Sequence, residues 1–172
     1  MINAKRSHHG GELGKAQNTA EVVLCGWVAK RRDHGGLIFV DLRDRSGIVQ
    51  VVVDPEAAGA SFKVAEDMRN EYVIKTVGKV RLRDEATINP NLATGEVEVL
   101  AREIEVLNAA KTPPFYIQDG IDTDENLRLK YRYLDLRRPE MQKNLILRHK
   151  VAKLMRDYLE NHNFLEIETP ML

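Results

Sequence analysis

The sequence predicts a mainly β fold with some α-helix: a small five-stranded barrel, then a hinge, then the start of an α/β domain. Three observations predict it. Five runs of alternating apolar and polar residues precede residue 108, and such alternation suits strands with one buried face. Two consecutive prolines, Pro113 and Pro114, oppose both helix and sheet interiors. A long apolar stripe at helical spacing follows them.

The barrel is predicted over residues 1–108. Its five strands are bounded by turn residues and are expected at Glu21–Ala29, Leu37–Arg43, Ile48–Asp54, Tyr72–Arg83 and Glu96–Leu107. Between the third and fourth strands, apolar residues recur at helical spacing, which predicts a short helix over Ala60–Glu71. Three strands, a helix and two strands is the order of the Greek-key barrel called the OB-fold. Other small β-barrels fit the strand count alone.

The second predicted strand has two different faces. Alternation within Leu37–Arg43 puts its aliphatic residues on one face and Phe39, Asp41 and Arg43 on the other. An aromatic ring among charges gains little from the core, so Phe39 is a candidate platform for stacking a base. OB-folds usually bind oligonucleotides or oligosaccharides on strands 2 and 3, where Gln50 also faces outward.

Residues 109–138 are predicted to form a linker or hinge. A helix is expected from Pro139, because proline favours the first turn of a helix, to residues 161–163. Phe164–Pro170 then looks like a strand interrupted by proline. One helix and one strand do not make an independent core, so residues 139–172 are expected to be the start of a truncated α/β domain.

Composition favours a soluble protein of the cytoplasm. The 172 residues are 43% hydrophobic and 30% charged, and no apolar run reaches the roughly 20 residues that span a bilayer. Cys25 is the single cysteine and is expected to be a reduced, packed thiol. The five histidines show no metal-ligand spacing, so no metal site is expected.

Positive charge is concentrated between Arg128 and Arg156. This stretch holds ten basic residues against only Asp135 and Glu140, although the whole chain has zero net charge. Such a concentration favours a polyanion as partner. The alternative is a solvated helix face whose acidic partners lie elsewhere in the chain.

Three blocks of the sequence resemble the bacterial aspartyl-tRNA synthetases: Gly26–Asp44, Arg128–Pro139 and Phe164–Pro170. The resemblance covers essentially the whole chain. The Arg-Arg-Pro at the end of the second block is not expected in lysyl relatives. The third block is similar to motif 1 of class II synthetases, whose helix and strand build the dimer interface, so the resemblance places Pro170 at that interface.

The resemblance implies an OB-fold that reads the tRNA anticodon, a hinge, and a catalytic domain. Phe39 would stack on an anticodon base, Arg32 and Gln50 would hydrogen-bond the central uridine, Arg83 would read the third base, and Glu98 would meet the first. Arginine and glutamine offer the donors and acceptors that the pairing edge of a splayed base needs. The alternative for the charged residues is ordinary surface pairing.

Two positions resemble the non-discriminating subgroup, which aspartylates both aspartate and asparagine tRNAs. His34 stands where discriminating members carry leucine, and Ala86 stands where they carry lysine. Thr87 also replaces an asparagine that often helps to read the third base. Because the two tRNAs differ at that base, losing a lysine beside it relaxes the reading. The alternative is a plain loop histidine and a neutral alanine.

For a full-length parent, the resemblance implies a homodimer that attaches aspartate to tRNA(Asp), and in the relaxed case tRNA(Asn), through an aspartyl-adenylate with ATP and Mg²⁺. Motifs 2 and 3 do not occur in residues 1–172, so this fragment alone is expected to be inactive, with no cofactor or catalytic residue of its own. Arg137 and Arg138 are expected to meet the tRNA backbone. The alternatives are a stand-alone OB-fold that binds single-stranded nucleic acid, and a module that pairs with protein through its helix stripe.

Overall fold

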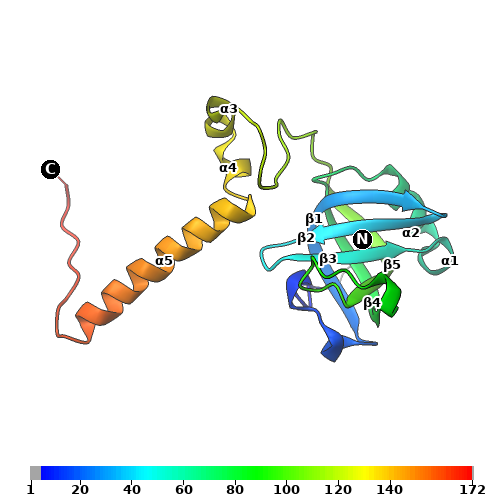
Figure 1. Ribbon diagram of the computed structural model, residues 1–172, viewed down its shortest axis with the longest axis horizontal. Helices are drawn as coiled ribbons and strands as arrows, with labels where there is room; N and C mark the ends of the chain where they lie inside the picture. The colour runs from blue at the N-terminus through cyan, green and yellow to red at the C-terminus, as the bar shows by residue number, and fades with distance from the viewer. Residues whose placement is uncertain (1–4, 172) are drawn as a thin grey trace. The chain divides into compact units, whose positions relative to one another are not determined.

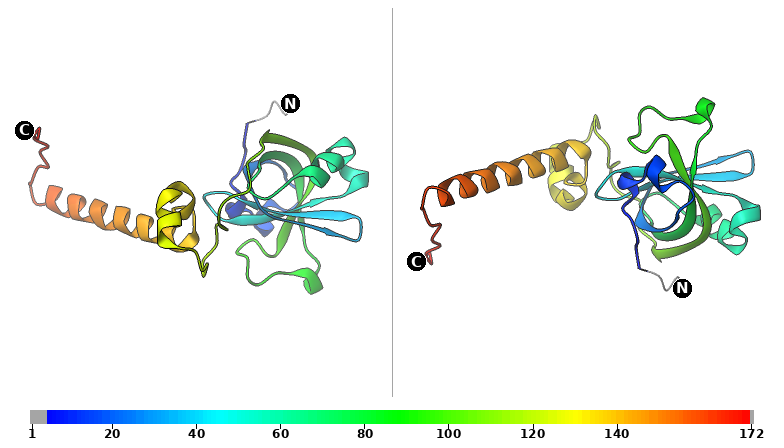
Figure 2. Two further views of the ribbon diagram at one scale, coloured as in Figure 1. Left: turned by 90° about the horizontal axis from the view of Figure 1, so that it is seen from above. Right: turned by 90° about the horizontal axis from the view of Figure 1, so that it is seen from below.

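Five strands close into a barrel in the computed structural model, which describes residues 5–171 (Figure 1). They are β1 (Glu21–His34), β2 (Leu37–Arg43), β3 (Ile48–Val53), β4 (Val73–Leu82) and β5 (Val97–Asn108). Around the barrel their order is β1-β2-β3-β5-β4, and the ring is visible from its end (Figure 2). Only the β3–β5 pair is parallel. This is the OB-fold, so the predicted fold class is confirmed.

The predicted element boundaries are wrong at two places in the barrel. Strand β1 continues past Ala29 to His34, because it pairs with β2 as far as the His34–Leu37 step after a bulge between Val28 and Lys30. The predicted single helix is two short ones, α1 (Pro55–Ala58) and α2 (Ala60–Asp67). They are separated at Gly59, whose φ of 50° interrupts the helical path.

Aliphatic side chains from all five strands fill the barrel. On β2, the alternation predicted from the sequence holds: Ile38, Val40 and Leu42 are buried, whereas Phe39 and Asp41 on the other face are half-buried. Ala58 of α1, Ala65 of α2 and Met68 directly after α2 are part of this core, and Phe62 and Val64 of α2 pack against it. The filled interior means that any ligand must bind on the outer wall or the loops.

Glycine is required where strands of the barrel approach closely. A Cβ added at Gly78 on β4 would lie 2.4 Å from the Leu100 carbonyl oxygen and 2.8 Å from Val99 Cγ1 on β5. At Gly26 on β1 it would lie 2.5 Å from the Arg43 carbonyl oxygen on β2. Backbone atoms held in a ladder do not move aside cheaply, so these two positions admit no side chain.

The segment before β1 packs on the turn between β2 and β3. The Gly10 amide donates to Asp44 Oδ2 at 2.7 Å, and the Gly11 amide donates to Ser46 Oγ at 2.8 Å. Burial opposes ionisation of Asp44, but hydrogen bonds from Ser46, Gly10 and His9 outweigh it and lower the pKa of this carboxyl. The charged carboxylate thus anchors the N-terminal segment to the barrel.

A second compact unit begins at Pro114 and contains α3 (Glu125–Lys130), α4 (Arg132–Asp135) and α5 (Pro139–Glu160). The start predicted for the long helix agrees with α5. Residues 115–138, expected to be part of a hinge, lie in this unit. The strand predicted at Phe164–Pro170 is absent: these residues are exposed and pair with no strand among residues 5–171, and an isolated strand has no partner for its backbone groups.

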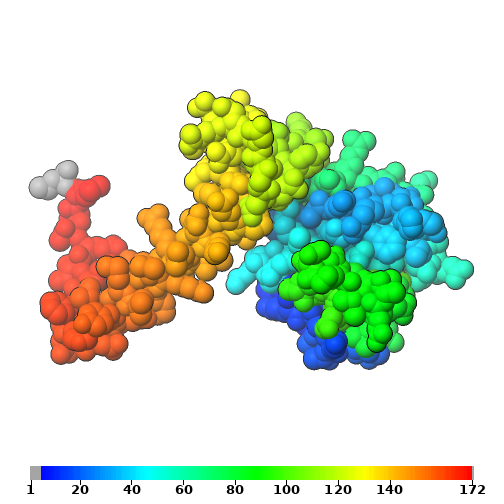
Figure 3. Space-filling model, in the orientation of Figure 1, coloured from blue at the N-terminus to red at the C-terminus, as the bar shows by residue number. Residues whose placement is uncertain are grey.

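The apolar stripe of α5 is exposed on the surface of the second unit. Figure 3 shows the chain of this helix in orange in a space-filling view. Leu147, Val151, Leu154 and Tyr158 are between 48% and 69% exposed. Large exposed apolar patches are typical of interaction surfaces. Within residues 5–171, no helix is long and apolar enough to cross a membrane.

Gly78→Ala should destabilise the barrel by about 1–3 kcal/mol, because the added methyl group overpacks a backbone contact. The matched control is Gly14→Ala, where the nearest atom to a Cβ is Gln17 Oε1 at 3.9 Å, and this change should be nearly neutral. Denaturant unfolding followed by fluorescence of Trp27, the single tryptophan, measures both. Equal stability of the two variants would contradict the close approach of β4 to β5.

Candidate nucleic-acid interface

The outer wall of the barrel gathers side chains from four strands. In the antiparallel register, Arg32 of β1 lies opposite Phe39 of β2, and Asp41 lies opposite Gln50 of β3. On its other side, β3 pairs with β5 in parallel, Val51 with Val99 and Val52 with Leu100. Gln50 and Glu98 each directly precede the first of these pairs, so they lie at the same level of the two strands. Glu98 in turn faces Arg81 of β4.

Phe39 is the aromatic residue of this wall. It is half-buried on the face opposite the core residues Ile38 and Val40, as its sequence position predicts. Its neighbours across the ladder are Arg32 and Val52. An aromatic side chain that is partly exposed between a guanidinium and an aliphatic residue suits stacking of a flat ligand.

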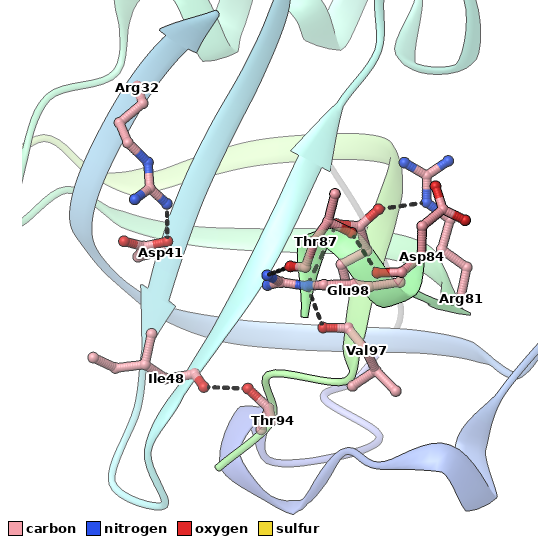
Figure 4. A network of polar contacts seen from close by, with 10 residues as sticks. Arg32, Asp41, Ile48, Arg81, Asp84, Thr87, Thr94, Val97 and Glu98 are labelled. Atoms are coloured by element: carbon pink, nitrogen blue, oxygen red, sulfur yellow. Dashed lines mark hydrogen bonds and ion pairs between the residues drawn. The ribbon is translucent and has the colours of Figure 1, made fainter. Parts of the chain in front are cut away.

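Two arginine–carboxylate pairs flank the middle of the wall (Figure 4). Arg32 Nη2 lies 2.5 Å from Asp41 Oδ1, and Arg81 Nε lies 2.7 Å from Glu98 Oε1. In both pairs the arginine is nearly half exposed, at 43% and 47%, whereas the carboxylates are only 17% and 13% exposed. The carboxylates therefore belong to the wall, and the guanidinium groups reach toward solvent from it.

Arg83 differs from these two, because its side chain is only 5% exposed. Its Nε donates to the Val97 carbonyl at 3.1 Å and its Nη1 donates to the Thr87 carbonyl at 3.3 Å. Its Nη2 is buried and has no hydrogen-bond partner. An unsatisfied buried donor costs about 1–3 kcal/mol, so this donor is available to an acceptor on water or on a bound ligand.

The electrostatic surroundings of Arg83 show that the charged groups of the wall share one site. Burial lowers the pKa of the Arg83 guanidinium; the negative charges of Glu98 and Asp41 oppose this shift, and the positive charge of Arg32 adds to it. Groups from β1, β2 and β5 thus act on one guanidinium that follows β4. Glu98 Oε2 lies 3.6 Å from Arg83 Nε, so this carboxylate is shared by two arginines.

The loop between β4 and β5 holds Arg83 in place. A tight 3-10 turn over Glu85–Thr87 supplies the Thr87 carbonyl, and Thr87 Oγ1 donates to the Asp84 carbonyl at 2.9 Å. Further along, the nearly inaccessible Thr94 donates from Oγ1 to the Ile48 carbonyl at 2.7 Å, which ties the loop to the start of β3 (Figure 4).

The structure brings the five sequence-predicted anticodon residues onto one wall: Arg32, Phe39, Gln50, Arg83 and Glu98. The two residues predicted to set tRNA discrimination lie at the end of β1 and in the turn after β4. His34 is exposed at the end of β1, before the Gly35-Gly36 turn, whose φ values of 63° and 82° are the left-handed conformation that glycine allows. Ala86 is exposed in the turn that holds Arg83.

Arg43, expected on the same outer face, is not part of this group. It forms a two-pronged ion pair with Glu71, with Nη1–Oε1 at 3.0 Å and Nη2–Oε2 at 2.6 Å, and both side chains are largely buried. Sequence reasoning also missed Arg81 as the partner of Glu98. Strand alternation shows that Arg81 points outward, but it does not show which carboxylate it meets.

Two expectations concern residues of the second unit. Arg138 is 7% exposed, and its Nε donates to the fully buried Asp135 at 2.8 Å, so the expected contact of Arg138 with an RNA phosphate is not supported by this structure. Asp135 also pairs with Arg128 and Arg132, so part of the basic stretch does have an internal acidic partner. Arg137 is half-buried, and Pro170 is exposed.

No group of histidine, cysteine and carboxylate side chains within residues 5–171 could hold a metal ion. Cys25 is half-buried on β1, where burial raises the pKa of its thiol despite the nearby Lys75 and Arg6. The wall therefore offers groups for stacking, for charge pairing and for hydrogen bonding to a ligand.

Comparison with known proteins agrees with this inventory. Residues 22–107 match the family model of the OB-fold nucleic acid binding domain, and residues 124–172 match the model of tRNA synthetases class II (D, K and N). Similar curated proteins include the aspartate–tRNA(Asp/Asn) ligases of Heliobacterium modesticaldum and Moorella thermoacetica. They are 65% identical over 98% of the chain and 63% identical over 100% of it. The chain spans about 28% of their length.

Solved structures give the same picture. Asparaginyl-tRNA synthetase from Pyrococcus horikoshii, complexed with asparaginyl-adenylate, is 25% identical, with a TM-score of 0.83 over 99% of this chain and 37% of that one. Aspartyl-tRNA synthetase from Entamoeba histolytica has a TM-score of 0.85 at 22% identity, over 96% of this chain and 39% of that one, and this likeness shows the fold alone. The chain belongs to the family of OB-fold nucleic acid binding domains, and it continues into the start of a class II tRNA synthetase domain of the D, K and N group.

Proposed function

We propose that this chain is the anticodon-recognition portion of an aspartate–tRNA ligase. The observation that carries the proposal is the buried, unpartnered Nη2 of Arg83 beside a wall that presents Phe39 and paired charges. An unpaired RNA base supplies both a ring for stacking and acceptors on its pairing edge. The match of residues 124–172 to a class II synthetase model favours the ligase over a stand-alone binder of single-stranded nucleic acid.

Each residue of the wall has a role that its chemistry allows. Phe39 stacks an anticodon base, and Arg32 and Gln50 hydrogen-bond the edge of the central uridine. Arg83 gives its free donor to the third base, and Glu98 accepts from the first. Gln50 is only 9% exposed, so the base must approach the wall closely for its pairing edge to hydrogen-bond the Gln50 amide. Arg137 stays a proposed contact with an RNA phosphate.

The catalytic part of the function concerns a longer protein. In it, we propose, aspartate is activated with ATP and Mg²⁺ to aspartyl-adenylate and transferred to the tRNA in the cytoplasm. Residues 1–172 contain no motif 2 or 3 to bind ATP, so these residues supply recognition and not chemistry. The exposed face of α5 and Pro170 are proposed to lie at the interface of a homodimer.

We further propose that the ligase accepts tRNA(Asn) as well as tRNA(Asp). The similar ligases carry both tRNAs in their names. Ala86 lies in the turn whose Thr87 carbonyl holds Arg83, so a lysine there would stand close to the reader of the third base. His34 is exposed in the hairpin two residues after Arg32. Histidine at position 34 and the small alanine at position 86, where discriminating members carry leucine and lysine, would leave the third base less constrained.

Phe39→Ala should weaken binding of an RNA stem-loop with the aspartate anticodon by about 1–3 kcal/mol, the value of one stacked base. Phe164→Ala is the matched control, because Phe164 is a 63% exposed phenylalanine that belongs to the second unit and not to the barrel. Fluorescence anisotropy of a labelled stem-loop measures both affinities. Equal affinities of the two variants for the stem-loop would show that Phe39 does not stack on a base.

Arg83→Lys keeps the positive charge but removes the free Nη2 donor. The variant should lose preference at the third anticodon base while keeping its preference at the central one. Arg102→Lys is the control, since Arg102 is 58% exposed and pairs with Glu21 on the barrel surface. Competition between stem-loops that differ at one base measures the preference. If Arg83→Lys kept the full third-base preference, the orphaned donor would not be the reader.

The full-length ligase should aspartylate tRNA(Asp) and tRNA(Asn) with similar kcat/KM. Ala86→Lys should lower the efficiency on tRNA(Asn) more than on tRNA(Asp), because a long cation beside the third base restricts its identity. Steady-state aspartylation of the two transcripts measures this. Strong preference of the unmodified enzyme for tRNA(Asp) would refute relaxed specificity and leave anticodon recognition itself untouched.

A further inference from the structure

Asp41 is a carboxylate in the middle of a wall that meets RNA, a polyanion, under the proposed function. It lies two residues after Phe39 on the same face of β2, and it faces Gln50 across the ladder. Its side chain is 17% exposed. Phosphate groups repel such a charge, so its position calls for a physical reason.

The contact of Asp41 supplies the reason. Its Oδ1 lies 2.5 Å from Nη2 of Arg32, whose side chain is 43% exposed. A free guanidinium at that exposure would pair with any backbone phosphate, because bidentate pairing with phosphate is the strong interaction of this group. Held by Asp41, the guanidinium is partly neutralised, and one of its amino groups is already engaged by a carboxylate that is itself mostly buried in the wall.

We propose that Asp41 is a specificity-determining residue that acts through Arg32. It orients the guanidinium toward a base edge and excludes backbone phosphates from the centre of the wall. The inference rests on the proposed function, since it needs RNA on this face. It goes beyond that function because it assigns a role to an acidic residue. The negative charge of Asp41 lowers the overall attraction for RNA, but it raises the selectivity for the correct base.

The charges around Asp41 agree with this role. Arg32 and Arg81 alternate with Asp41 and Glu98, so the wall carries nearly as much negative as positive charge. Both carboxylates are more buried than the arginines they hold. A surface built for phosphates would instead present unpaired lysines and arginines, and its affinity would depend steeply on salt. This wall is arranged for base edges.

Asp41→Asn tests the proposal in the whole 172-residue chain. The probes are a stem-loop with the aspartate anticodon and the same stem-loop with its central uridine changed to cytidine. The variant should bind the changed stem-loop severalfold more tightly than the unmodified chain does. For this variant, the slope of log Kd against the logarithm of the salt concentration should become steeper by about 0.7 for each phosphate that it newly contacts. The ratio of the two affinities should therefore fall.

Three further variants make the result specific. Asp33→Asn removes a carboxylate that is 57% exposed and lies 3.8 Å from Arg31 Nη2, and it should leave the ratio unchanged. Asp41→Glu restores the carboxylate and should restore selectivity. In the double variant Arg32→Gln/Asp41→Asn, the extra affinity and the steeper salt dependence should both disappear, because the freed guanidinium is gone.

A parallel loss of affinity for both stem-loops, or an unchanged ratio, in Asp41→Asn would overturn the proposal. Misfolding would weaken binding, whereas the supporting outcome is tighter binding of the changed stem-loop. The two outcomes are therefore distinguishable. Failure of the proposed function looks different: the unmodified chain would then show no preference for the aspartate anticodon at all. If the unmodified chain prefers that anticodon and Asp41→Asn keeps the preference, only this inference fails.

Discussion

The parallel pairing of β3 with β5 is the contact on which the rest of the wall depends. The other four strand pairs are antiparallel and form a ribbon that could remain open, and the β3–β5 pair closes it. Closure places Gln50 of β3 near Glu98 of β5, although they are far apart in the sequence, and it buries the aliphatic side chains on the inner face. A filled interior then places the charged residues of the alternating strands on the outside, where the proposed function has them meet RNA.

The arginine side chains discussed above fall into three structural groups. Arg43 and Arg138 are paired with Glu71 and Asp135 and largely buried, so they hold structure together. Arg32 and Arg81 are partly exposed and rest on carboxylates of the wall. Arg83 is buried yet keeps one donor unpaired. The exposure of each guanidinium and the identity of its partner, rather than residue type, separate the arginines proposed to recognise RNA from the structural ones.

The two units have opposite surface character. The barrel buries its apolar residues and presents paired charges, whereas α5 leaves leucine, valine and tyrosine side chains exposed along its length. The small helices before α5 have a local centre of their own in Asp135, which three arginines surround. The polar surface of the barrel is the one proposed to recognise RNA, and the exposed apolar face of α5 is the one proposed to contact a second protomer.

Alternation and turn chemistry, read from the sequence, determined the number and order of the strands, the bounds of β2, the start of α5 and the outward direction of Phe39. These are local properties, because side-chain direction along a strand repeats every two residues. The pairings of Arg43 with Glu71, Arg32 with Asp41 and Arg81 with Glu98 came from the folded chain, as did the orphaned donor of Arg83. A long charged side chain chooses its partner by distance across neighbouring strands, and that distance exists only once the barrel has closed. For the same reason the strand expected at Phe164–Pro170 did not form, because extended backbone needs a neighbour that the sequence pattern alone cannot provide.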